Sequence, residues 1–233
     1  MSVIPKTSSE TLDLMPDLDA TLHVKMVWPK KKRKLLPRII AAIKRELASP
    51  NIYGLQWGDP DIVRPLRFIR DRYVLPYRSP EHIAVEIGPG GGRWTRYLLD
   101  FKKLYVVDYH AELLGELKKN FRNPSMEFVK NNGTDFPGIA ERSIDYLFSF
   151  GTFVHLDAPI IETYLANMKM ILKPGANAVI QYSDKNKIMA QLNESFSENT
   201  PEKMRTMVLN AGYTILEEDL TTLWHSSVIR FTV

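Results

Sequence analysis

Short apolar runs alternate with longer mixed segments over the C-terminal two thirds of the chain. Apolar runs bounded by turn residues predict buried strands, and apolar residues at helical spacing between them predict helices. The predicted strands span residues 83–87, 104–108, 126–130, 143–150, 178–182, 213–219 and 226–233. The predicted helices span residues 61–73, 111–121, 160–172, 183–197 and 201–211, with a further helix starting over 94–99. Alternation of this kind predicts an α/β domain, and the last two strands predict an antiparallel pair.

The first predicted strand ends in a glycine-rich turn. Ile83 to Ile87 is apolar except for Glu86, and Gly88-Pro89-Gly90-Gly91-Gly92 follows directly. Glycine lets a ligand approach the backbone closely, and the carboxyl end of a parallel strand is where nucleotide-like cofactors bind. An ordinary strand-to-helix turn is the alternative, but such a turn rarely needs four glycines. The pattern therefore predicts a cofactor site.

The spacing of the glycines separates two cofactor classes. The dinucleotide fingerprint G-x-G-x-x-G fails in both registers, because its third glycine falls on Arg93 or on Thr95. An acid two residues before G-x-G-x-G instead resembles motif I of the class I S-adenosylmethionine-dependent methyltransferases. That resemblance places an acid near the methionine end of the cofactor and the turn beneath it. The residues it implies are Glu86, Gly88, Pro89, Gly90 and Gly92.

Further landmarks follow in the order that this family shows. Asp108 ends the second strand 20 residues after Gly88, where an acid accepts both ribose hydroxyls. The resemblance places Asn132 and Gly133, with Asp135 as a weaker candidate, on the adenine edge. It also places Ser149, at the end of the fourth strand, beside the cofactor.

The resemblance covers about residues 80–233 and implies a complete fold. That fold is Rossmann-like, with a seven-stranded, mostly parallel sheet, an antiparallel C-terminal strand and helices on both faces. We expect residues 80–233 to form the cofactor-binding domain. Residues 1–79 are expected to form an N-terminal helical extension with a basic arm and a substrate lid.

A narrower resemblance concerns the acceptor. Asn132-Gly133, Ser143-Ile144-Asp145, Ser149-Phe150 and Val154-His155 are similar to bacterial sugar and polysaccharide O-methyltransferases. Members of that group often carry His-His-Ser-Asn at the end of the fifth strand, where this chain has residues 181–184, Gln-Tyr-Ser-Asp. This difference leaves the acceptor sugar and the methylated hydroxyl open.

The loop after the fourth strand carries the candidate catalytic group. It lacks the [DNS]-P-P-[FY] box of amine methylation and contains His155 instead. A neutral histidine takes a proton from a hydroxyl near pH 7, so the sequence predicts O-methylation by in-line displacement, with S-adenosylhomocysteine as product. The alternative is a core histidine bonded to the backbone. Mg²⁺ is left open, because some sugar methyltransferases use it, and no metal ligands are predicted.

Three residues are candidates for contacting the acceptor. Trp57 and Asp59 lie in an aromatic and polar loop before the first strand, and Tyr182 lies in the fifth strand. An aromatic face packs well on a sugar ring and a carboxylate holds hydroxyls. For Trp57, packing in the core is an equal alternative.

The positive charge is concentrated before the cofactor landmarks. Residues 1–80 hold 15 Lys and Arg against 8 Asp and Glu, although the whole chain has a net charge of only +4. The run Lys30–Lys34 is read as a solvated lead-in to a helix, with a nuclear import signal or a nucleic-acid patch as the alternative. Together with the amphipathic segment 35–47, it would also suit peripheral contact with an acidic membrane surface.

These features leave two other function classes open. One is an RNA or ribosome-associated methyltransferase anchored by the basic run, although nucleic acid is not the expected partner. The other is a non-catalytic cofactor-binding protein. The absence of cysteine excludes disulfides, zinc–thiolate sites and thiol catalysis. No apolar run has the length of a membrane span and no secretory signal is visible, so we expect a cytoplasmic enzyme. The oligomeric state is left open.

Overall fold

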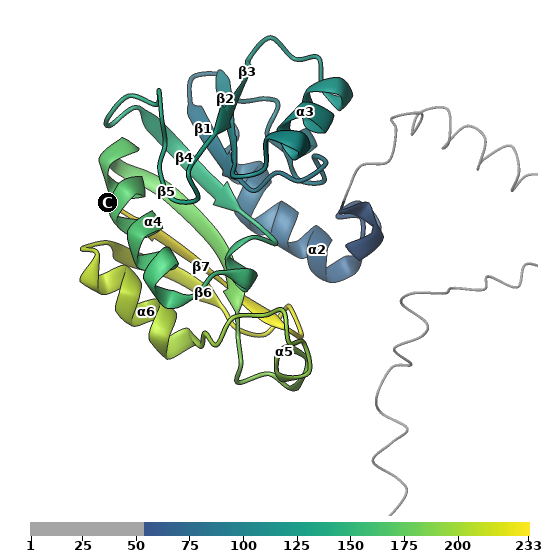
Figure 1. Ribbon diagram of the computed structural model, residues 1–233, viewed down its shortest axis with the longest axis vertical. Helices are drawn as coiled ribbons and strands as arrows, with labels where there is room; N and C mark the ends of the chain where they lie inside the picture. Colours follow the sequence, from purple (N-terminus) through teal and green to yellow (C-terminus); the bar gives the residue numbers. More distant parts are fainter. Residues whose placement is uncertain (1–53) are drawn as a thin grey trace, which may run out of the picture. The chain divides into compact units, whose positions relative to one another are not determined.

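The predicted strands pair into one sheet in the computed structural model, which describes residues 54–233 (Figure 1). The seven strands have the order β3-β2-β1-β4-β5-β7-β6. Strands β1 to β5 are parallel, and β7 is antiparallel to both β5 and β6. The strands are β1 (Ile83–Ile87), β2 (Lys103–Asp108), β3 (Met126–Lys130), β4 (Ile144–Ser149), β5 (Leu172–Ser183), β6 (Thr214–Asp219) and β7 (Ser226–Thr232). This arrangement confirms the predicted Rossmann-like methyltransferase sheet.

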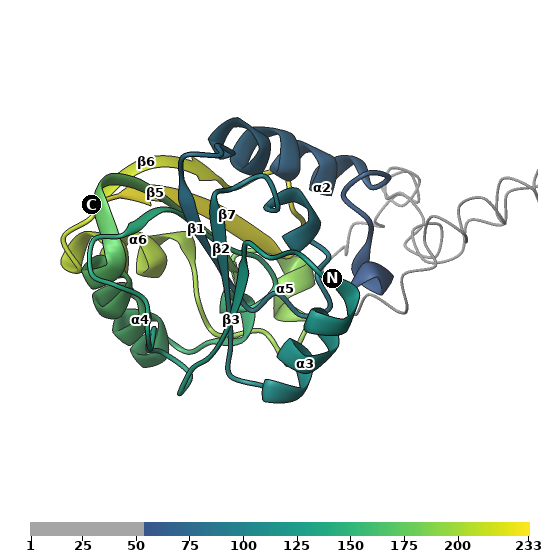
Figure 2. The same cartoon turned by 90° about the horizontal axis from the view of Figure 1, so that it is seen from above.

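Helices cover both faces of the sheet. They are α2 (Arg64–Ile69), α3 (Ala111–Asn120), α4 (Ala158–Ile171), α5 (Ile188–Gln191) and α6 (Pro201–Asn210). Figure 2 shows α2 on the opposite side of the sheet from α4. Short 3-10 turns at Leu55–Trp57, Thr95–Tyr97 and Phe153–His155 lie in the connecting loops.

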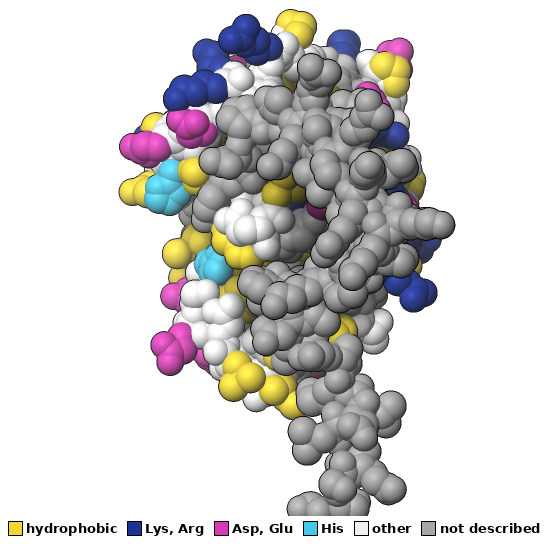
Figure 3. All heavy atoms as spheres, turned by 90° about the vertical axis from the view of Figure 1, so that its right-hand side faces the viewer, with side chains coloured by type: hydrophobic (Ala, Val, Ile, Leu, Met, Phe, Trp, Pro, Cys, Tyr) yellow, Lys and Arg dark blue, Asp and Glu magenta, His cyan; other side chains and the backbone are white. Residues whose placement is uncertain are grey.

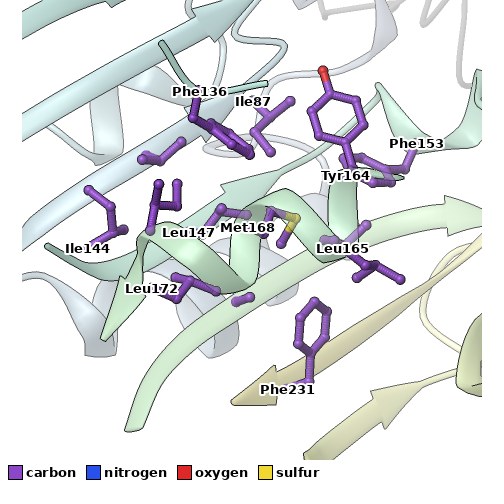
Figure 4. Close-up of a cluster of buried hydrophobic side chains, with 14 of the residues drawn as sticks. Ile87, Phe136, Ile144, Leu147, Phe153, Tyr164, Leu165, Met168, Leu172 and Phe231 are labelled. Atoms are coloured by element: carbon purple, nitrogen blue, oxygen red, sulfur yellow. The ribbon is translucent and has the colours of Figure 1, made fainter. Parts of the chain in front are cut away.

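Each face of the sheet has its own hydrophobic core, because the strands are buried on both sides. One core joins residues of α4 and α6 to β1, β4, β5 and β7, and Figure 4 shows part of it. Its labelled side chains are Ile87, Phe136, Ile144, Leu147, Phe153, Tyr164, Leu165, Met168, Leu172 and Phe231. The other core joins α2 and α3 to the opposite face, and it includes Trp94 and Phe148. The two cores fix the strands whose carboxyl ends form the candidate site.

The helical segment before β1 packs against the sheet. The prediction of one helix over residues 61–73 was wrong in detail: α2 continues as a π-helical turn, Arg70–Val74, and then a 3-10 turn, Leu75–Tyr77. The hydroxyl of Tyr146 in β4 donates to the backbone carbonyl of Tyr73. This buried hydrogen bond and the apolar contacts around it hold the irregular helix against the sheet.

Two other helix predictions were wrong. After the glycine turn, only Thr95–Tyr97 is helical, because Trp94 packs its ring against Phe148 and Phe150 instead of continuing a helix. Over residues 183–197 only α5 is an α-helix. There the ammonium group of Lys187 donates to the backbone carbonyls at positions 223 and 226, which anchors the chain locally.

The run Lys30–Lys34, segment 35–47 and the rest of the N-terminal extension before residue 54 lie outside the described residues. Within residues 54–233, no helix combines the length and the apolar composition that crossing a bilayer requires.

Candidate active site

Packing within the protein itself requires glycine at two positions of the turn after β1. Gly88 has φ +68°, and a Cβ added there would lie 1.8 Å from the hydroxyl oxygen of Thr152. Gly92 has φ +100°, and a Cβ there would lie 2.2 Å from the ring of Phe121. Both positions therefore require glycine for backbone conformation and for close packing. The sequence reasoning attributed these glycines to the cofactor alone.

Glu86 lies beneath this turn and is 2% exposed. Its carboxyl Oε2 accepts a hydrogen bond of 2.6 Å from the Thr95 hydroxyl. Burial raises the pKa of Glu86 to about 8, an effect that the Thr95 bond partly opposes. The carboxyl group is therefore largely protonated at neutral pH, and it joins the strand before the turn to the residues after it.

Asp108 ends β2, the strand beside β1, and is 8% exposed. Its Oδ1 accepts a hydrogen bond of 2.8 Å from the amide of His110. Burial raises the pKa of this carboxyl group, although the amide bond acts in the opposite direction. The carboxylate is thus fixed at the carboxyl edge of the sheet, next to the glycine turn, which is the position expected for a ribose ligand.

Tyr109 is a residue that the sequence reasoning missed. Its side chain is 56% exposed, directly after Asp108. A Cβ added at Gly133 would lie 3.7 Å from its ring, and the ammonium of Lys130 lies 5.6 Å from the ring centre. The ring therefore lies in contact with the loop after β3 and exposes a surface on which a flat heteroaromatic group can stack. The signal available in the sequence was an aromatic residue directly after the acid.

The loop after β3 is held by its own hydrogen bonds. The side-chain oxygen of Asn132 accepts from the amides of Thr134 and Asp135, and the Gly133 amide donates to the side chain of Asn131. The Gly133 amide already has a partner, so an adenine contact through this amide requires the loop to rearrange. The adenine contacts of Asn132 and Gly133 stay a prediction.

Ser149 lies at the junction of β4 and β1. It is fully buried, and its hydroxyl donates a hydrogen bond of 2.9 Å to the backbone carbonyl of Ile87. The side chain therefore ties the two strand ends together, and contact with a cofactor stays a prediction.

His155 lies in the 3-10 turn after β4 and is exposed. Its Nδ1 is 2.8 Å from the backbone carbonyl oxygen of Ser195. Its ring meets Phe196 edge-on, with centroids 5.4 Å apart, and Phe196 meets His225 in the same way at 5.3 Å. Two imidazoles from distant parts of the chain therefore both contact the ring of Phe196.

His225 was passed over from sequence because it does not follow the fourth strand. It precedes β7, whose first residues pair with the last residues of β5 at the carboxyl edge of the parallel strands. Its Nδ1 is buried without a hydrogen-bond partner among the described residues. Burial lowers the pKa of His225, and the positive charges of Lys187 and Arg93 lower it further. This imidazole is therefore neutral at physiological pH.

A buried amide connects these loops. Gln181 in β5 accepts a hydrogen bond of 2.7 Å from the Gly151 amide, and its own amide donates to the Ser226 hydroxyl at 2.6 Å. The loop after β4 and the start of β7, next to His225, are thereby held in one fixed arrangement.

The three predicted acceptor contacts have different surroundings. Trp57 is 59% exposed, whereas Tyr182 is fully buried within the hydrophobic core. Asp59 forms an ion pair with Arg96 and accepts from the amide of Asp61. The side chain of Trp57 is therefore accessible to solvent, and Asp59 is paired within the protein. The burial of Tyr182 in the core does not fit direct contact with an acceptor.

Among residues 54–233, no group of three or more His, Asp or Glu side chains is arranged to hold a metal ion. The glycine turn, the carboxylate of Asp108 and the exposed Tyr109 ring fit an adenosine-containing cofactor, since they offer close backbone approach, a hydroxyl acceptor and a stacking surface.

Comparison with known proteins agrees with this geometry. Residues 84–175 match a family described as a methyltransferase domain. No curated protein matches the chain in sequence. Many solved structures share its fold, and they include S-adenosylmethionine-dependent methyltransferases from two bacteria. The Aquifex aeolicus enzyme is 15% identical, with a TM-score of 0.56, and the match covers 82% of this chain and 98% of that chain.

The Mesorhizobium loti enzyme is 11% identical with a TM-score of 0.62, covering 75% of this chain and all of the other. The CcbJ methyltransferase from Streptomyces caelestis is 14% identical with a TM-score of 0.61, covering 76% and 99%. At these identities the likeness shows the fold, while the family match covers β1 to the start of β5 with the glycine turn and Asp108. Residues 84–175 therefore match a methyltransferase domain, and the chain has the fold of S-adenosylmethionine-dependent methyltransferases.

Proposed function

We propose that this enzyme methylates a hydroxyl group of a sugar, an oligosaccharide or another small molecule, with His155 as general base. The observation that carries the proposal is the 2.8 Å contact between His155 Nδ1 and the carbonyl oxygen of Ser195. A carbonyl oxygen only accepts hydrogen bonds, so Nδ1 holds the proton of the neutral ring. Nε2 then keeps its lone pair and is able to accept a proton from a hydroxyl.

The position of this imidazole suits the chemistry. Bound S-adenosylmethionine supplies an electrophilic methyl group, and the protein must hold the acceptor oxygen in line with it. The Gly151 amide and Gln181 fix the loop that carries His155, while Phe196 packs against the imidazole ring. A side chain held from two sides is oriented before the acceptor binds, which lowers the cost of reaching a reactive geometry.

The acceptor class is argued from exposed hydrophobic side chains among the described residues. Figure 3 shows hydrophobic and histidine side chains among polar groups on the face that is turned to the right in Figure 1. Trp57, Leu192 and Trp224 are all more than half exposed. Exposed aromatic rings pack on the apolar faces of sugars, and this agrees with the resemblance to sugar O-methyltransferases seen in the sequence.

A labelling screen tests the proposal. The enzyme is incubated with methyl-labelled S-adenosylmethionine and separate glycan, glycolipid, small-molecule and RNA fractions. We expect label in a hydroxyl-bearing carbohydrate or small molecule, as an alkali-stable methyl ether. Label confined to RNA would contradict the proposal and support the alternative that uses the basic run. Cofactor binding without labelling of any fraction would support a non-catalytic role.

The base is tested separately with the labelled acceptor. His155→Ala is expected to lower turnover by about 10²–10⁴-fold while S-adenosylhomocysteine binds with unchanged affinity. His82→Ala is the matched control, because His82 is exposed before β1, at the opposite edge of the sheet. If His225→Asn abolishes turnover and His155→Ala does not, the base is His225 and the assignment to His155 is wrong.

A further inference from the structure

The side chain of Arg93 lies inside the protein beside the glycine turn and is 8% exposed. Its Nη1 donates to the backbone carbonyls of Trp57 and Gly58, at 3.3 and 3.5 Å. The centre of the guanidinium lies 5.5 Å from the ring centre of Phe150 and 5.9 Å from that of Trp94. The direct contacts of this cation are therefore with neutral groups, and its hydrogen bonds to them are long.

No carboxylate among residues 54–233 forms an ion pair with Arg93. The two carboxyl groups that influence it are engaged elsewhere: Asp59 pairs with Arg96, and Glu86 is largely protonated at neutral pH. Burial lowers the pKa of Arg93 to about 10, so the side chain is still charged at pH 7. A buried cation without a counterion is unfavourable, and a ligand anion would relieve this cost.

The strand order places this charge relative to the rest of the cofactor site. β1 lies between β2 and β4, so the glycine turn lies between Asp108 at the end of β2 and the loop after β4. A Cβ added at Gly151, in that loop, would lie 3.8 Å from Nη2 of Arg93. Asp108 and the guanidinium are thus on opposite sides of the turn, which matches a ligand with hydroxyls at one end and an anion at the other.

We propose that Arg93 binds the carboxylate at the amino-acid end of S-adenosylmethionine. The ribose hydroxyls are then held from the β2 side and the carboxylate from the β4 side. A planar guanidinium donates two parallel hydrogen bonds to a carboxylate, which fixes the orientation of that end as well as neutralising its charge. This assignment concerns cofactor binding and does not depend on the identity of the acceptor.

Two ligands that differ at the amino-acid end test the proposal by calorimetry. S-adenosylhomocysteine carries the carboxylate, whereas 5′-methylthioadenosine keeps the adenosine and the thioether but lacks the amino-acid end. Arg93→Met is expected to weaken S-adenosylhomocysteine binding by about 10- to 100-fold, since hydrogen bonds to charged groups are lost. Binding of 5′-methylthioadenosine is expected to change less than about twofold, because Arg93→Met removes no contact to it.

Two further variants complete the test. Arg93→Lys keeps the charge but loses the bidentate geometry, so an intermediate affinity for S-adenosylhomocysteine is expected. Lys130→Met removes a cation on the adenosine side and is expected to affect both ligands equally. Equal loss of both ligands in Arg93→Met would show that Arg93 only supports the turn, and no loss of either would also overturn the proposal. If Arg93→Met does not fold, Arg93→Gln replaces it in the same comparison.

Discussion

The Thr95 hydroxyl donates a hydrogen bond of 2.6 Å to the buried carboxyl group of Glu86. The bond spans the glycine turn, because Glu86 is the fourth residue of β1 and Thr95 begins the 3-10 turn that follows. The two ends of the glycine turn are therefore joined by two side chains that are both shielded from solvent.

Stability is expected to depend on pH through Glu86. Its pKa is raised from 4.5 to about 8 in the folded protein, so the unfolded chain loses this proton at a lower pH than the folded protein does. The free energy of unfolding is then highest below the unfolded pKa and falls, by up to about 1.4 kcal/mol per pH unit, as pH rises through the folded value.

Glu86→Gln keeps an oxygen that can accept from Thr95 but cannot ionise. Urea unfolding between pH 5 and pH 9, compared for the two proteins, is expected to give a flatter profile for the variant. Parallel profiles would show that Glu86 is not the titrating group.

Cofactor affinity is expected to depend on Asp108. The Asp108→Asn variant loses a charged acceptor for the ribose hydroxyls, so S-adenosylhomocysteine should bind at least about 10-fold more weakly. Burial raises the pKa of Asp108. On acidification, the affinity of the wild-type protein for S-adenosylhomocysteine should therefore begin to fall at a higher pH than it would with an aspartate of ordinary pKa. The variant should lack this step. Asp100→Asn, at an exposed ion pair with Arg78, serves as the control for calorimetry.

Gly88→Ala is expected to destabilise the fold and abolish cofactor binding. The added Cβ would lie 1.8 Å from the Thr152 hydroxyl and 2.9 Å from its Cβ, at a backbone φ of +68° that alanine rarely adopts. Gly115→Ala is the matched control, because a Cβ there meets no atom within 4 Å and the residue lies in α3. In a helix this change should stabilise by up to about 1 kcal/mol. Thermal melting of both variants checks the contrast, and equal melting temperatures would contradict it.

Tyr182→Phe is expected to leave kcat/KM close to the wild-type value. Tyr182 is fully buried among core residues, so an acceptor does not reach its hydroxyl without opening the core. Steady-state kinetics with the acceptor found in the labelling screen measures the effect. A fall of 10-fold or more at unchanged melting temperature would restore Tyr182 as a substrate contact.

Local pattern was enough to predict the strands, the glycine turn and the position of Asp108, while the arrangement of the sheet was implied by the family resemblance. Apolar runs and turn residues are properties of short segments, and the 20-residue spacing from Gly88 to Asp108 is fixed by one strand–turn–strand unit. Local pattern failed at residues 94–99, where burying the Trp94 ring among aromatic side chains outweighs helix propensity.

The sequence by itself therefore determined which segments form the strands of the cofactor-binding half and which residues end them. Only the tertiary structure decided which side chains meet there. β7 inserts beside β5 and brings His225 to Phe196 and His155, while burial on both faces removes Tyr182 from the site. It also leaves Arg93 without an ion-pair partner among residues 54–233, because Asp59 pairs with Arg96 and Glu86 is largely protonated at neutral pH. Charge balance and burial depend on residues distant in the chain, and no local pattern encodes them.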